Sequence, residues 1–244
     1  MTLHPVTLLR DAAALFLTNL VWLYGDFFAA RIASLTLLFL LFPGQAVWLV
    51  AGGEAPAPIL YFVNASSLIG SAIFAVVSLG AVRRLWERVG GGASPPPWGV
   101  VGWTPVLVLS LALDHVVTAG ILFLLVPGLI LQALTTTVLP LLAIEGAGWR
   151  AVERAVAMAR PHLLVLTVAW SVVILPWLSL FIFGGPAEAQ DEVALFDLWV
   201  RAIFSDLFTP AFIGFSACLS VVTYRRLIEA EGGGPDDRLT DIFR

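Results

Sequence analysis

Six long apolar stretches constrain this chain more than any other feature. Each is close to the length of about 20 residues that a helix needs to cross a hydrocarbon core of about 30 Å. A chain inside a bilayer must satisfy its own backbone hydrogen bonds, because no water is present to do so. The sequence therefore predicts an all-α, polytopic transmembrane helical bundle with spans near residues 30–51, 58–82, 104–126, 127–144, 162–183 and 198–224.

The composition excludes a water-soluble domain. Hydrophobic residues make up 59% of the 244 residues and charged residues only 12%, whereas a soluble domain has about 25% charged residues. The apolar stretches are spread along nearly the whole chain, which leaves no room for a separate soluble domain. We therefore expect residues 1–230 to form a single membrane domain and residues 231–244 to form a disordered cytoplasmic tail.

The arginines predict the orientation of the bundle, because positive charges near span ends favour the cytoplasmic side of a membrane. If the N-terminus is cytoplasmic, every arginine except Arg201 falls on that side. The loops on the other side carry acidic residues, namely Glu54, Glu188, Asp191, Glu192 and Asp197. An odd number of spans would break this alternation. The sequence thus predicts an even number of spans with both termini in the cytoplasm.

Three cytoplasmic stretches are predicted to be amphipathic helices along the membrane surface: Leu9–Asp26, Val82–Val89 and Gly148–Arg160. The first of them could instead extend the first span, and the sequence leaves both possibilities open. Arginines next to a membrane attract anionic lipid heads. We accordingly predict lipid-head contacts for the arginines of the second and third stretches, which are Arg83, Arg84, Arg88, Arg150 and Arg154.

Polar residues at mid-depth in the spans form the candidate functional site. An ionisable side chain in hydrocarbon is costly unless it is paired or hydrated, and so it often marks function. Asp114 and His115 lie near the middle of the third span but point about 100° apart around the helix. Asp114 could face the second span or the fourth, where the polar residues are Asn64, Ser67, Ser71, Gln132, Thr135, Thr136 and Thr137.

Two hypotheses remain open for this cluster, whose core members are Asp114, His115, Asn64, Gln132 and Thr136. In the first, it binds a proton, an ion or a small polar group. In the second, it is a hydrogen-bonded network that only locks three helices together.

Other polar and aromatic residues of the spans have structural interpretations. Arg201 and Asp206 in the sixth span are predicted to form a structural ion pair. Trp170 and Trp177 are seven residues apart on the fifth span, share a face, and are interpreted as helix-packing residues. Cys218 falls in an apolar stretch and is interpreted as a small buried side chain.

No catalytic signature is visible in the sequence. The three histidines and the single cysteine do not form a zinc pattern or a triad, and a chain without lysine has no P-loop. The scattered arginines also argue against nucleic-acid binding. We therefore expect no enzyme activity, no metal and no cofactor.

Part of the chain resembles a known family. The segments that carry the resemblance are Leu124–Leu131, Val138–Gly146, Ala151–Arg160, Tyr224–Leu227 and the pair Glu231–Gly232. In this order they resemble bacterial proteins with the glycerophosphoryl diester phosphodiesterase membrane domain and the related YciC-like group. The resemblance covers roughly residues 120–232, with Ala155 and Pro161 where the family usually has serine and glycine.

The resemblance implies a multi-pass protein of the bacterial inner membrane. The family name comes from fusions to a phosphodiesterase domain, which is not present here, so that activity does not carry over. The leading hypothesis is a non-enzymatic accessory or scaffolding protein whose partners are membrane lipids and, as a candidate, another membrane protein. The alternative is a small transporter or lipid-handling protein that uses the polar cluster around Asp114.

Overall fold

The computed structural model describes residues 3–41, 57–90, 100–183 and 192–231. Within these ranges the chain is helical and contains no β-strand, which confirms the predicted all-α bundle. Six segments are long and apolar enough to cross a membrane: Pro5–Ser34, Leu68–Arg88, Thr104–Ile121, Leu125–Glu145, Gly148–Leu178 and Phe208–Ala230. The chain is thus a multi-pass membrane protein.

The helices follow one another with short connections. Their bounds are α1 Pro5–Leu41, α3 Ala57–Arg88, α4 Val100–Phe123, α5 Leu125–Thr135, α6 Val138–Pro140, the π-turn η1 Leu141–Glu145, the 3₁₀ turn η2 Gly148–Arg150, α7 Ala151–Ala159, the 3₁₀ turn η3 Arg160–His162, α8 Leu163–Phe183 and α9 Glu192–Ala230.

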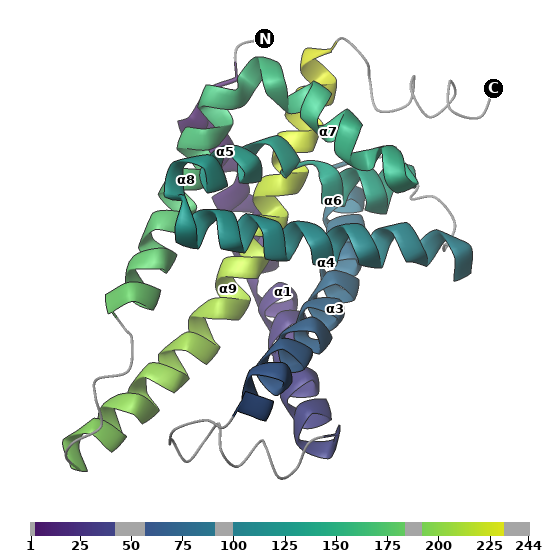
Figure 1. Cartoon of the computed structure of the whole chain (residues 1–244). Coiled ribbons are helices and arrows are strands. Elements are labelled where there is room, and N and C mark those ends of the chain that lie inside the picture. Colours follow the sequence, from purple (N-terminus) through teal and green to yellow (C-terminus); the bar gives the residue numbers. More distant parts are fainter. Residues whose placement is uncertain (1–2, 42–56, 91–99, 184–191, 232–244) are drawn as a thin grey trace.

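Three long helices form the frame of the bundle. Figure 1 shows α1 running opposite to α3 and α9, so that the start of α1 meets the ends of the other two. In the same view α4 crosses α3, and α5 folds back along α4. The remaining helices gather toward the end where α1 begins and α9 ends. That end is therefore the densely packed part of the molecule.

The core lies around the C-terminal half of α9. Cys218, Val221 and Tyr224 are buried there, and α1 packs against the same helix. A Cβ atom on Gly214 of α9 would lie only 3.2 Å from the ring of Phe16 on α1. The small residue thus lets α1 approach α9 closely.

Two of the three predicted surface helices are not separate helices. Leu9–Asp26 lies inside the unbroken helix α1, and Val82–Val89 forms the end of α3 and the residue after it. The physical reason is that neither boundary contains a proline or another strong helix-breaking feature. The open question about Leu9–Asp26 is thus answered by extension, and the first membrane-length segment begins near Pro5, earlier than predicted. The stretch Gly148–Arg160 does form its own segment, α7 with a 3₁₀ turn on each side.

The predicted hairpin of the third and fourth spans is present, but its break lies earlier than the sequence suggests. The break is at Leu124, whose φ and ψ are −142° and 71°. Pro127 lies within the first turn of α5, where its missing N–H costs no helical hydrogen bond. Gly120 and Gly128 meet backbone to backbone across this turn, since a Cβ on Gly128 would come within 2.6 Å of the Ile121 Cα atom.

We predict that Gly128→Ala destabilises the protein, because the added methyl group has to displace backbone rather than a flexible side chain. Forced overpacking of this kind costs about 1–3 kcal/mol. Cys218 is fully buried, so a thiol-reactive dye that labels it on heating reports the unfolding temperature. The matched control is Gly80→Ala, because a Cβ there meets nothing within 4 Å. An unchanged unfolding temperature in Gly128→Ala would contradict the close hairpin.

Candidate functional site

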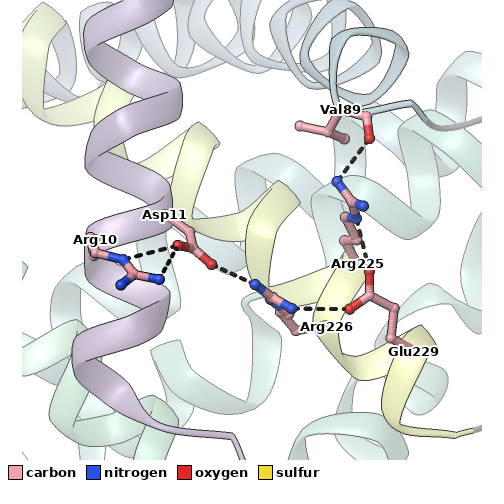
Figure 2. A network of polar contacts seen from close by, with 6 residues as sticks. All are labelled: Arg10, Asp11, Val89, Arg225, Arg226 and Glu229. Atoms are coloured by element: carbon pink, nitrogen blue, oxygen red, sulfur yellow. Dashed lines mark hydrogen bonds and ion pairs between the residues drawn. The ribbon is translucent and has the colours of Figure 1, made fainter.

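Ion pairs join the helices at the densely packed end of the bundle. Figure 2 shows Asp11 of α1 accepting hydrogen bonds from Arg10 and from Arg226 of α9, the latter at 2.7 Å. Arg226 also pairs with Glu229 at 3.3 Å. The side chains involved are half-buried or exposed, so each surface pair contributes little alone. Together they tie the first turns of α1 to the last turns of α9.

The end of α3 joins the same network. Arg225 of α9 donates one hydrogen bond to Glu229 and another, at 2.8 Å, to the Val89 backbone carbonyl (Figure 2). The latter carbonyl follows the end of α3, where helical carbonyls lack partners within their own helix. Arg225 therefore caps α3 from α9.

The arginines of α3 contact α1. Arg84 forms an ion pair with Asp26 at 2.7 Å, and Arg88 donates to the side chain of Asn19. Both guanidinium groups lie over the ring of Trp22, at 5.5 and 5.1 Å from its centre, a distance at which cation–π attraction operates. Lipid-head contacts for Arg84 and Arg88 stay a prediction, as they do for Arg83 and Arg150, and these two arginines also have partners in the protein.

The sequence analysis missed a buried polar triad beside α7. Glu145 ends the π-turn η1, and its side chain, only 6% exposed, binds both Arg154 of α7 and the hydroxyl of Tyr224 of α9. Gly146 follows in the left-handed conformation, with φ of 64°, and ends the turn. Arg154, a predicted lipid-head contact, is thus engaged by Glu145. Only the pattern Glu-Gly before an amphipathic helix could have signalled this triad.

A cavity of about 390 Å³ lies between α3, α4, the α5–α6 segment, α8 and α9. It contains several residues of the predicted polar cluster: Asp114, Gln132 and Thr136 all line it, and Ser71 of α3 joins them. Asp114 is exposed whereas Thr136 is only 3% exposed, so the carboxylate lies nearer the mouth of the cavity and Thr136 nearer its floor.

The Asp114 carboxylate is held by α3. The Ser71 hydroxyl donates a hydrogen bond of 2.8 Å to it, across 43 positions of sequence. In the described part of the chain no arginine forms an ion pair with Asp114, and no basic residue lines the cavity. Asp114 is the charged residue of the described lining.

Other predicted site residues are not brought to this cavity. His115 is exposed and does not line it, and its Nδ1 lies 2.8 Å from the Leu111 backbone carbonyl. This agrees with the expected divergence of two adjacent helical residues. The side chain of Asn64 lies outside the described residues, as do those of Arg201 and Asp206. The proposed ion pair of Arg201 and Asp206 therefore stays a prediction.

The deeper walls of the cavity combine aromatic rings with hydroxyl groups. Trp170 donates a buried hydrogen bond of 2.9 Å to the Thr136 hydroxyl. The rings of Trp177 and Phe212 are stacked with centres 5.2 Å apart. The hydroxyls of Ser110 and Ser216 are buried without a protein hydrogen-bond partner among the described residues. Buried hydroxyls in this state are costly unless something bonds them.

Chemically, the site can bind and orient a ligand, but it does not have the groups of a metal centre. Among the described residues, no group of three or more histidines, cysteines and carboxylates lies together in a way that would hold a metal ion. Only one carboxylate borders the cavity there, without a histidine or cysteine beside it.

Comparison with known proteins gives no relative from which a function could be transferred. No protein-family model matches the chain, and neither a curated protein nor a solved structure matches it. The functional argument therefore rests on the geometry of the site.

We predict that Glu145→Gln strongly destabilises the protein, because Arg154 would lose the charge that compensates it. Breaking a buried ion pair costs about 3–5 kcal/mol, and the partial exposure of Arg154 puts this case at the lower end. Thermal unfolding followed by labelling of Cys218 measures the loss. The matched control Glu229→Gln removes a carboxylate from the half-buried network of Figure 2 and should cost at most about 1 kcal/mol. Equal losses in both variants would contradict a structural role for the buried triad.

Proposed function

We propose that this protein binds a small polar or amphipathic molecule beside Asp114, within the membrane, as a carrier or a lipid-handling protein. The observation that carries the proposal is the Asp114 carboxylate at the mouth of a cavity of about 390 Å³. That volume lies in the range of about 300–1,000 Å³ typical of ligand pockets.

A role limited to packing fits this geometry poorly. Protein interiors are close-packed, with few voids larger than a water molecule. A polar network that only locked helices together would be expected to fill its space and pair its groups. Here the buried hydroxyls of Ser110 and Ser216 line open space without a protein partner. These features support binding over locking.

The scaffolding hypothesis from the sequence stays untested, and no contact surface in the described residues favours it with comparable detail. The binding hypothesis is therefore the one preferred here. The resemblance to the phosphodiesterase membrane domain family likewise stays a prediction, and it is compatible with either role.

The orientation is proposed from the grouping of arginines. Arg84, Arg88, Arg225 and Arg226 contact one another's helices at the end of the bundle where α1 begins. Positive charge concentrates on the cytoplasmic side of membrane proteins. We therefore propose that this end faces the cytoplasm of a bacterial cell and that both termini lie there.

We predict that a defined small molecule or lipid stays bound when the protein is released from lipid nanodiscs in native mass spectrometry. Asp114→Asn removes the charge but keeps the shape, so this adduct should be lost or strongly reduced. The matched control Glu153→Gln changes an exposed carboxylate of α7 and should keep it. Equal adducts in both variants would contradict the proposal, and a stoichiometric protein partner independent of Asp114 would favour scaffolding.

The orientation can be tested with single cysteines in a Cys218→Ser background. Val6 is 64% exposed and Trp149 is 58% exposed. Cysteines replacing them should react with a membrane-impermeant maleimide only after the cells are permeabilised. Ala187→Cys, in the loop that the sequence assigns to the other side, should react in intact cells. Labelling of Val6→Cys in intact cells would reverse the orientation.

A further inference from the structure

We infer that the ligand of the Asp114 cavity carries an organic ammonium group. This inference rests on the proposed function and adds the chemical class of the ligand. It follows from three features of the site: the charge of Asp114, the aromatic walls and the unpaired hydroxyls.

The charge of Asp114 lacks the compensation that other carboxylates of the bundle have. Asp11, Asp26, Glu145 and Glu229 each form an ion pair with an arginine. Asp114 receives the Ser71 hydroxyl, and no arginine pairs with it in the described part of the chain. Its position near the middle of a membrane-length helix makes an uncompensated charge costly. A cation that enters the cavity would supply the missing charge.

The walls favour an organic cation over a bare metal ion. Phe74, Trp170, Trp177 and Phe212 line the cavity, and the stacked pair Trp177–Phe212 presents aromatic surface within it. Aromatic faces attract ammonium groups that carry alkyl substituents, and this attraction grows when water is excluded. Calcium, by contrast, takes about six to eight oxygen ligands, and one carboxylate does not provide them.

The hydroxyls give the ligand places to orient its polar groups. Ser110 and Ser216 are buried, line the cavity and have no protein partner among the described residues. A hydroxyl oxygen can accept a hydrogen bond from a protonated amine, or the hydroxyl can donate to an oxygen of the ligand.

The same ammonium chemistry has two possible sources. One is an amphipathic amine dissolved in water or membrane, and the other is the head group of an ammonium-bearing lipid. Val116, on the same helix as Asp114 and two residues away, is 55% exposed. An apolar surface of this kind beside the mouth is compatible with entry from the bilayer.

The test compares two probes of nearly the same shape. Benzyltrimethylammonium carries the charge, and neopentylbenzene is its uncharged carbon analogue. Binding of each to the protein in phosphatidylglycerol nanodiscs is measured by equilibrium dialysis. The wild-type protein should bind the cation about tenfold or more tightly than the analogue, as expected for a charge-assisted contact. Empty nanodiscs correct for partition into lipid.

Variants separate a lost charge from a lost fold. Asp114→Asn should abolish the preference for the cation but leave the binding of neopentylbenzene, and Glu153→Gln should retain the preference. Phe212→Leu keeps the carboxylate and should reduce the preference by weakening the aromatic wall. Thermal labelling of Cys218 shows that each variant is folded. Nanodiscs that also contain phosphatidylethanolamine distinguish the sources, because a lipid ligand would compete with the probe whereas a soluble amine would not be replaced by it.

Two results would overturn the inference. If the wild-type protein binds both probes equally, the cavity holds ligands without regard to charge, and the proposed binding function survives. If it binds neither probe although native mass spectrometry shows an Asp114-dependent adduct, the ligand belongs to another class. The absence of both probe binding and the adduct would also remove the proposed function.

Discussion

The contact between α1 and the C-terminal half of α9 is the interaction on which the rest of the structure depends. It extends from the Asp11–Arg226 pair at the end of the bundle to the close approach at Gly214. Residues such as Cys218 and Tyr224 are buried because other helices then cover the remaining faces of α9. The end of α3 is attached to this pair through Arg225 and through Arg84. The helices from α4 to α8 complete a bundle that encloses a cavity rather than a solid core.

Much of the fold could be predicted from the sequence because the bilayer leaves few choices. Apolar runs of membrane length predict the helices, and the count of six membrane-length segments is confirmed. The polar residues of separate spans could also be matched by depth, and Asp114, Gln132 and Thr136 do line one cavity. Depth along each helix follows from counting residues, so no packing detail was needed for this grouping.

The parts that could not be predicted depend on contacts between distant residues or on single backbone angles. Glu145 and Tyr224 are 79 positions apart, and nothing in the local sequence relates them. The hairpin breaks at Leu124 because of the backbone contact between Gly120 and Gly128, whereas proline and glycine drew attention to the positions after it. The unbroken helix α1 appeared as two pieces because its polar residues interrupt the apolar run, although they do not interrupt the helix. Those polar residues, Asn19 and Asp26, are used by the arginines of α3.

The central claim is that Asp114 and Ser71 face one another at the mouth of a cavity between α3, α4, α8 and α9. A cryo-electron microscopy structure of the protein in lipid nanodiscs, bound to a small rigid antibody fragment, tests this claim most directly. The account predicts density that joins the Ser71 and Asp114 side chains, and a cavity whose far wall is formed by Trp170, Trp177 and Phe212. A map in which Asp114 faces another helix or the lipid, with the space between α4 and α9 filled by side chains, would contradict it.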